Sequence, residues 1–377
     1  MSDEQKKESS LFFPALDTLR AIFCLTVVSY HVATNIMAHN VPGGGGDLNS
    51  GILGAGAFGV PFFFVLSAFL ISHLLLEEQV RTRKVNVVAF YARRALRVWP
   101  VYFLVLVSSF LLVEKIAGRP IIWAWGPPFS FFIANLVMTS GALTAPTMSI
   151  APLWSVSVEE QFYFLWPWVS KLVRPRGMLF VAVALIAAAP AFRDFRFQTG
   201  STTHERHWYF TLTHMDSFGA GILACLVHRQ GLGTNLKRHL GWVAVSALAI
   251  VVAVQVWTGT LTSQPSLSEA GVWLYTLVPL CGATVVFAAA QEAAGLHPFW
   301  KNPLALWPGK LSYGIYAFHG ISIVLITDKA SGAPLDVAWR AAATFAATIG
   351  MATCSYYLIE RPLLRVKSRL QVVASGT

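Results

Sequence analysis

The first apolar segment of the sequence carries an arginine and a histidine at a spacing that could serve acid–base chemistry. Arg20 and His31 stand eleven residues apart, at the two ends of "RAIFCLTVVSYH", so both fall on one face of a helix. Asp17 lies one turn before Arg20 on that face and could pair with it. The face therefore offers a cation and, roughly 16 Å further along the axis, an imidazole that can act as a base. The alternative is a histidine hydrogen-bonded to a neighbouring helix and an arginine whose charged end reaches the interface.

Three arginines cluster at the start of another apolar segment. In "FYARRALRVWPVYF", Arg93 and Arg97 are four residues apart and share a helix face, and Arg94 flanks them. Guanidinium groups stay charged and bind phosphate through paired hydrogen bonds. The cluster therefore predicts a site for an anionic co-substrate such as a nucleotide-bearing thioester. The alternative is that these arginines set the topology and contact lipid headgroups.

A carboxylate and two hydroxyl groups share a face in a further segment. In "PLWSVSVEEQFYFLWP", Ser155, Glu159 and Tyr163 follow one another at intervals of four residues. A buried carboxylate beside a histidine orients the imidazole or raises its basicity, so we expect Glu159 to contact His31. The spacing does not decide between Glu159 and Glu160, and one of the two could instead cap the helix start.

A second histidine lies in a later apolar segment. In "KLSYGIYAFHG", Tyr313, Tyr316 and His319 recur every three residues and drift slowly around the helix. His319 either binds substrate or forms a hydrogen bond across helices. Polar and ionisable residues within a membrane are costly and are usually functional, so each of these side chains is a candidate site residue.

The elements that carry these residues are apolar and helical. Hydrophobic residues make up 55% of the 377 residues and charged residues 12%, whereas a soluble domain carries about 25% charged residues. Apolar blocks of about twenty residues are long enough to cross a bilayer. The sequence predicts an all-α polytopic membrane protein with ten spans: 11–38, 55–76, 98–115, 153–170, 177–191, 208–228, 240–257, 271–290, 306–326 and 337–358. The apolar stretch 129–141 is short, and we expect a re-entrant or surface helix there.

Lysine and arginine are distributed unevenly between the two sides of this arrangement. With the N-terminus inside, the inner segments carry nineteen of these residues and the outer segments six, which favours an N-in, C-in topology. The outer loop 192–207 holds three arginines and fits least well. Short basic inner loops account for the formal charge of +10, so nucleic acid is not an expected partner. We expect cytoplasmic tails over 1–10 and 363–377, and a membrane domain over 11–362.

Taken in order, these stretches resemble the acyltransferase 3 family of membrane proteins, which includes O-acetyltransferases of surface polysaccharides and acyltransferases of macrolides. The matching pieces run from residue 16 to residue 362: "LDTLRAIFCLTVVSYH", "GVPFFFVLSAFLIS", "FYARRALRVWPVYF", "LWSVSVEEQFYFLWP", "LSYGIYAFHG" and "YYLIERP". Thr18 stands where the family usually has glycine, and Ala68 replaces the usual glycine in "FFVLSAF". The family typically has ten membrane helices, which agrees with the ten predicted spans.

The resemblance implies that an acyl group, most often acetyl from acetyl-CoA, is delivered across the membrane to an acceptor hydroxyl. His31 matches the essential histidine of the family's first helix, and Arg20 matches its basic partner. Arg93 and Arg97 match arginines that are important for activity, and Glu159 matches the family's glutamate. The expected catalytic residues are His31 and Glu159. The expected acyl-CoA-binding residues are Arg20, Arg93, Arg94 and Arg97. The expected substrate-binding residues are Ser155, Tyr163, Tyr316 and His319.

The expected partners are acyl-CoA as co-substrate, a carbohydrate or glycosylated acceptor, and the lipids of a bacterial inner membrane. No metal is expected, because the four cysteines show no metal-ligand spacing. The alternative function is a polytopic transporter of a polar or glycan substrate, which would also carry histidine, glutamate and arginine inside the membrane. Transporters more often show two related halves or paired broken helices, and the sequence shows neither pattern.

Overall fold

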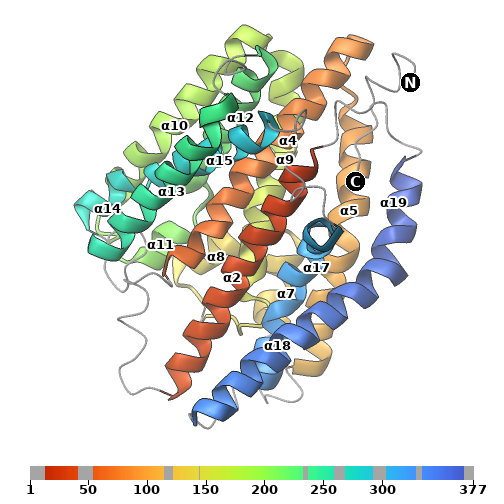
Figure 1. The fold of residues 1–377 in the computed structure, drawn as a ribbon, viewed down its shortest axis with the longest axis vertical. Coiled ribbons are helices and arrows are strands. Elements are labelled where there is room, and N and C mark those ends of the chain that lie inside the picture. Colours follow the sequence, from red (N-terminus) through yellow and green to blue (C-terminus); the bar gives the residue numbers. More distant parts are fainter. Residues whose placement is uncertain are drawn as a thin grey trace.

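The computed structural model describes eight stretches of the chain: 13–40, 54–113, 122–143, 145–231, 237–258, 268–291, 303–327 and 333–368. Figure 1 shows a bundle of long helices, and no β-strand occurs within these stretches. Eight helices in the described stretches are long and apolar enough to cross a membrane. The all-α polytopic fold that the composition predicted is therefore confirmed.

The helices follow one another along the chain with these bounds: α2 (Pro14–Asn40), α4 (Gly59–Thr82), α5 (Val87–Ser108), α7 (Ile122–Ser130), α8 (Ala134–Ser140), α9 (Trp154–Leu172), α10 (Pro175–Gln198), α11 (His204–Trp208), α12 (Met215–Arg229), α13 (Lys237–Thr258), α14 (Glu269–Leu274), α15 (Leu277–Gln291), α17 (Pro303–Ile326), α18 (Pro334–Ser355) and α19 (Arg361–Ser368). Short 3₁₀ and π segments connect or extend them: η1 (Gly54–Phe58), η2 (Ser109–Val113), η3 (Ala151–Leu153), η4 (Thr211–His214) and η8 (Tyr356–Glu360). Each of the ten predicted spans overlaps at least one of these α-helices.

The predicted spans and the helices agree in most but not all respects. Of the overlapping helices, α9 and α12 have 19 and 15 residues and are not among the eight long apolar ones. The count of ten crossings and the N-in, C-in topology therefore stay predictions. The stretch 129–141 falls at the end of α7 and in α8, helices of nine and seven residues that are too short to span.

The arginine-rich helix α5 begins at Val87, well before the predicted start at residue 98. The side chain of Asn86 accepts a hydrogen bond from the backbone N–H of Ala89 at 3.0 Å and so caps the first turn. The arginine cluster, which precedes the predicted span and was expected at a helix start, therefore lies well inside the helix. Asn86 is a typical N-cap residue and marks the start of α5. The predicted span began later because its start was placed at the first continuous apolar residues.

Helix α10 also exceeds its predicted bounds, because it runs to Gln198 rather than to residue 191. Arg193 was assigned to an outer loop, but it lies within α10 and its exposed fraction is 3%. The unusual number of arginines in that predicted loop is therefore partly explained. Arg193 belongs to the buried interior rather than to the outer surface.

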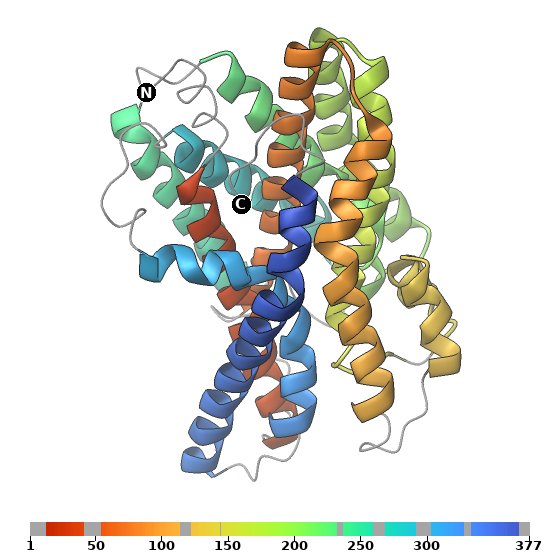
Figure 2. The ribbon, with the colours of Figure 1, turned by 90° about the vertical axis from the view of Figure 1, so that its right-hand side faces the viewer.

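Helix α2, which carries Arg20 and His31, packs against two other long helices. It contacts α17 and α4, while α12 packs against α4 and α10. A Cβ atom on Gly309 of α17 would lie 2.2 Å from the carbonyl oxygen of Asp17, and one on Gly59 of α4 would lie 2.5 Å from that of Phe23. Glycines at such points let two helix backbones approach closely. Figure 2 shows the side of the bundle where α19 lies beside α5, while α18 packs against α17.

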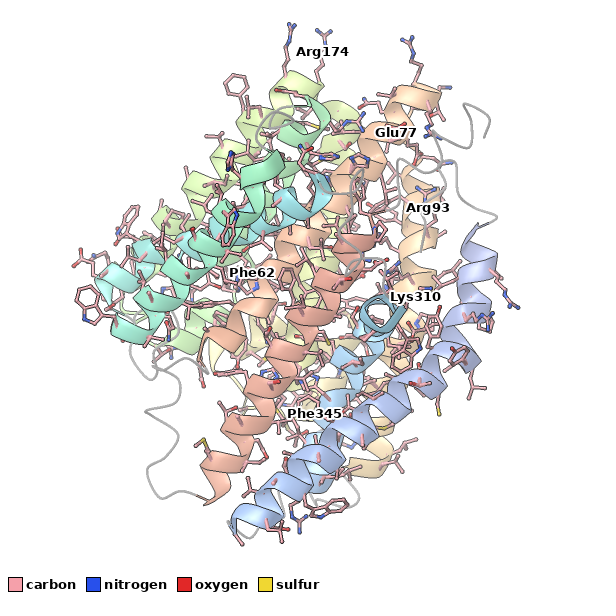
Figure 3. All side chains as sticks on the ribbon, viewed as in Figure 1. Phe62, Glu77, Arg93, Arg174, Lys310 and Phe345 are labelled. Carbon is pink, nitrogen blue, oxygen red and sulfur yellow. The ribbon has the colours of Figure 1, made fainter. Side chains whose placement is uncertain are left out.

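Charged side chains gather at one end of the bundle. Figure 3 shows Arg174 and Glu77 at this end, with Phe62 and Phe345 further along the helices. Glu77 pairs here with Arg229 at 3.1 Å. In the predicted topology this end faces the cytoplasm.

Candidate active site

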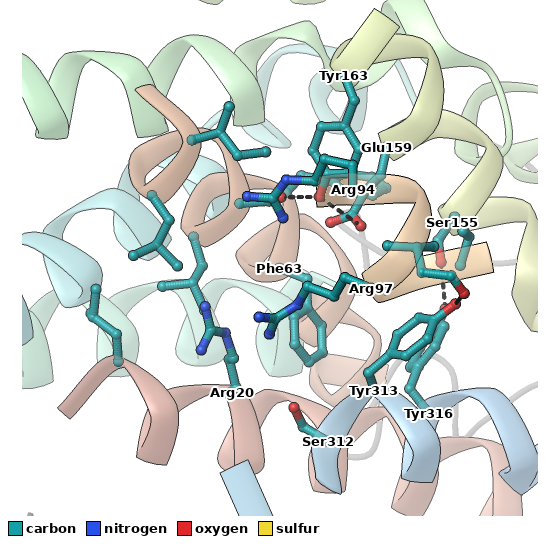
Figure 4. A pocket seen from close by; sticks show the side chains of 18 of the residues that line it. Arg20, Phe63, Arg94, Arg97, Ser155, Glu159, Tyr163, Ser312, Tyr313 and Tyr316 are labelled. Carbon is teal, nitrogen blue, oxygen red and sulfur yellow. Dashed lines mark hydrogen bonds between the residues drawn. The ribbon is translucent and has the colours of Figure 1, made fainter. Parts of the chain in front are cut away.

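A pocket lies between α2, α4, α5, α9 and α17 and encloses about 1310 Å³, part of it continuous with open solvent. Figure 4 shows how side chains from these helices point into it. Leucine, phenylalanine and valine side chains form much of its wall. Its ionisable and hydroxyl-bearing lining residues are Asp17, Arg20, Ser67, His73, Arg94, Arg97, Ser155, Glu159, Tyr163, Ser312, Tyr313 and Tyr316. We refer to this cavity as the arginine pocket.

Three guanidinium groups face the arginine pocket, as Figure 4 shows. Arg20 forms the predicted ion pair with Asp17. Arg94 lies over the ring of Tyr163, with its guanidinium carbon 5.2 Å from the ring centroid. Within the described stretches, Arg97 makes no hydrogen bond and no ion pair. The guanidinium groups of the pocket therefore carry more N–H donors than the acceptors of the pocket lining satisfy.

Arg93 does not line this pocket. Its Nη2 atom lies 3.0 Å from Oε2 of Glu78 on α4, and the other oxygen of Glu78 accepts from the backbone N–H of Asn86 at 2.8 Å. Arg93 thus joins α4 to the start of α5. The spacing rule allowed both Arg93 with Arg97 and Arg94 with Arg97 on one face, and the structure selects the second pair.

The structure also separates the two adjacent glutamates. Glu159 lines the pocket and accepts a hydrogen bond from the hydroxyl of Tyr163 at 3.1 Å. That hydroxyl in turn accepts from Ser67 of α4, a residue that the sequence analysis did not single out. Glu160 lies outside the pocket lining and accepts from the indole N–H of Trp99 at 3.2 Å. The predicted face of α9 is confirmed as a pocket wall.

Ser155 and Tyr316 close the pocket at its far side. The hydroxyl of Tyr316 donates to the carbonyl oxygen of Pro152 at 3.0 Å and lies 2.7 Å from Oγ of Ser155. These bonds tie α17 to the start of α9. The ring of Tyr316 forms part of the pocket wall.

The two predicted histidines meet behind this wall. Nδ1 of His31 lies 2.9 Å from Nε2 of His319, and the rings are parallel to within 3°. The ring centroid of His319 is 5.5 Å from that of Tyr316, but neither histidine lines the pocket. Our prediction that Glu159 contacts His31 is wrong, because Glu159 bonds Tyr163 and the ring partner of His31 is His319. No cluster of three or more His, Cys, Asp or Glu side chains that could hold a metal occurs among the described residues.

A second buried charge cluster lies away from the pocket and was missed in the sequence. Arg193 donates to the carboxylate of Asp216 at 2.9 Å and to the hydroxyl of Thr276 at 2.6 Å. It also donates to the backbone carbonyls of Thr213 and Val272. These bonds join α10, α12 and the α14–α15 region. An isolated acidic residue in an apolar segment was the signal for Asp216, but its partner could not be identified from spacing.

Comparisons with known proteins agree with the sequence motifs. A family model described as an acyltransferase domain matches residues 13–359. The chain is 27% identical over 383 residues to the putative peptidoglycan O-acetyltransferase YrhL of Bacillus subtilis, covering 95% of this chain and 56% of that protein. It is 25% identical over 374 residues to the peptidoglycan O-acetyltransferase OatA of Listeria monocytogenes, covering 94% and 56%. For the O-acetyltransferase OatA of Staphylococcus aureus strain NCTC 8325, identity is 27% over 383 residues, covering 95% and 58%. The chain thus spans a little over half the length of these relatives, and no solved structure matches it.

Proposed function

Because the chain belongs to the acyltransferase family whose model matches residues 13–359, we propose that it is a membrane O-acyltransferase. It moves an acyl group, acetyl in the first instance, from acyl-CoA to a hydroxyl group of a carbohydrate. The names of the three relatives support an O-acetyl product, and two of them name peptidoglycan as the acceptor.

The observation that carries this proposal is the excess of guanidinium groups in the arginine pocket. Arg20, Arg94 and Arg97 face two carboxylates, Asp17 and Glu159, across the lining. Withdrawing a cation from water without a partner costs free energy, and phosphate groups are bidentate partners that suit arginine well. The phosphates of CoA satisfy these donors, whereas the carboxylate of Glu159 adds a negative charge to the lining.

His31 supplies the base in this reaction. Its imidazole takes the proton of the acceptor hydroxyl while the hydroxyl oxygen bonds to the acyl carbon. The carbon–sulfur bond of the thioester then breaks, and the thiolate receives the proton back from the imidazolium. Tyr316 lines the pocket and its ring neighbours that of His319, which does not line the pocket, so the proposed reaction includes a displacement of the Tyr316 ring as the acyl group arrives.

The proposed orientation follows from the distribution of charge. Nineteen Lys and Arg residues fall on the predicted inner side and six on the outer side, which favours an N-in topology in a bacterial cytoplasmic membrane. Acyl-CoA then enters from the cytoplasm. The acceptor approaches the histidines from the outer side.

Binding and transfer by the purified protein test this function. Radiolabelled acetyl-CoA should bind saturably to the protein in lipid nanodiscs, and unlabelled CoA should compete. With peptidoglycan fragments present, mass spectrometry should detect the gain of an acetyl group that alkali removes, as expected of an ester. A protein that shows no saturable binding of acetyl-CoA would exclude the proposal and favour the transporter alternative.

A further inference from the structure

The imidazole pair between α2 and α17 is held in a defined register. Cys24 donates to the carbonyl oxygen of Ser312 at 3.3 Å, and seven residues further along each helix His31 meets His319. The two helices therefore run parallel and keep the same residue register through this region. Beyond the pair, Thr327 donates to the side chain of Asn35 at 2.7 Å. Bonds on both sides of the histidines fix their separation.

The ring of His319 has little freedom to move. Its exposed fraction is 0%. The next residue is Gly320, where an added Cβ would lie 2.3 Å from the carbonyl oxygen of Met148. The helix backbone is thus pressed against the segment before α9, and the imidazole is enclosed.

The hydrogen bonds of the pair define which nitrogens carry protons. Nδ1 of His319 contacts the backbone carbonyl oxygen of Tyr316. A carbonyl oxygen can only accept, so Nδ1 of His319 is the protonated nitrogen. In a neutral imidazole the other nitrogen is an acceptor, so Nε2 of His319 accepts from Nδ1–H of His31. The chain of bonds leaves Nε2 of His31 without a proton.

We propose that His319 is a positioning residue that holds His31 in the tautomer with a basic Nε2. This inference rests on the proposed acyl transfer and names the group that prepares its base. In hydrolytic triads a carboxylate plays the equivalent part, by accepting from Nδ1–H and stabilising the imidazolium that forms. A neutral imidazole provides the same acceptor without burying an additional anion.

The proton balance of the reaction uses this arrangement. When Nε2 of His31 takes the hydroxyl proton, the positive charge is stabilised by the bond from Nδ1–H to His319. When the thiolate leaves, Nε2 returns the proton to sulfur and the pair regains its starting state. His319 exchanges no proton in either step.

Two substitutions separate this role from simple packing. Glutamine at position 319 keeps a carbonyl acceptor near the position of Nε2, whereas leucine fills similar space without any acceptor. We expect His319→Leu to lower kcat by about 100-fold and His319→Gln by no more than about tenfold. KM for acetyl-CoA should be unchanged in both, because His319 does not line the arginine pocket. Thr348→Val is the matched control, because it removes a buried hydrogen bond between α18 and Ser322 of α17 that takes no part in holding the pair, and it should transfer at the rate of the wild-type protein.

The tautomer can be observed independently of turnover. In ¹⁵N-histidine-labelled protein in lipid, NMR should show His31 protonated at Nδ1 and unprotonated at Nε2. In His319→Leu the signal should change to the Nε2–H tautomer, which is favoured for free histidine. A wild-type His31 protonated at Nε2, or unchanged kcat in His319→Leu, would overturn the inference while the acyltransferase function stands. Absence of transfer by the wild-type protein, with the Nδ1–H tautomer observed, would count against the proposed function instead.

Discussion

Two arginines in long helices of this protein, one buried and one half-buried, are bonded in opposite ways. Arg193 on α10 donates to the carboxylate of Asp216, to a hydroxyl group and to two backbone carbonyls. Arg97 on α5 has no hydrogen bond or ion pair in the part of the chain that the structure describes. It also shares its pocket with Arg20 and Arg94. One guanidinium is satisfied by the protein, and the other is available to a ligand.

The difference shows why burial of a charge does not by itself identify a functional site. A buried pair such as Arg193 with Asp216 has its desolvation offset by surrounding hydrogen bonds, so its role is to hold three helices together. Arg97 is half-buried and lacks these bonds within the described residues. Unmet hydrogen-bonding capacity, rather than burial, therefore distinguishes the proposed binding site from the structural cluster.

The largest expected effect is a loss of stability when Arg193 of the structural cluster is replaced. Arg193→Met leaves the carboxylate of Asp216 buried without its cation, which typically destabilises a protein by about 3–5 kcal/mol. We expect a marked fall in the thermal unfolding temperature in detergent and in the yield of monodisperse protein. Arg97→Met is the matched control and should unfold at or above the temperature of the wild-type protein. Equal stability of Arg193→Met and the wild-type protein would contradict the distinction.

A smaller effect is expected on KM for acetyl-CoA when Arg97 of the arginine pocket is replaced. Arg97→Gln removes a charge-assisted bond to the donor, worth about 1.5–3 kcal/mol, so KM for acetyl-CoA should rise by about 10- to 100-fold. Initial rates over a range of acetyl-CoA concentrations measure this change. Arg93→Gln serves as the control, because Arg93 pairs with Glu78 outside the pocket, and its KM should not change. The reverse result, with KM raised only in Arg93→Gln, would restore the grouping favoured by the sequence.

The smallest expected effect is on the affinity for acetyl-CoA when a negative charge is removed from the pocket lining. Glu159→Gln removes a negative charge from the lining, so acetyl-CoA should bind more tightly by about fivefold, the equivalent of about 1 kcal/mol. Glu160→Gln should leave the affinity unchanged, because Glu160 lies outside the lining. Equilibrium binding at low and high salt measures both, and the gain should shrink at high salt. Weaker binding by Glu159→Gln would show that its carboxylate bonds the donor directly.

Local patterns in the sequence predicted much of the site. The ion pair of Asp17 with Arg20 and the shared face of Ser155, Glu159 and Tyr163 follow from helical spacing. The choice between Arg93 and Arg94 does not, because spacing places either residue on a face with Arg97. The position of Glu78 on α4 decides it.

The sequence by itself determined that the chain is helical and apolar, and which polar residues share each helix face. Helical periodicity is a local property, so these features can be read from neighbouring residues. Only the tertiary structure decided that His31 meets His319, 288 residues away, and that Glu159 bonds Tyr163 instead. Such meetings depend on where helices approach closely, as at Gly309 against Asp17, and the shapes of the packed surfaces set those points.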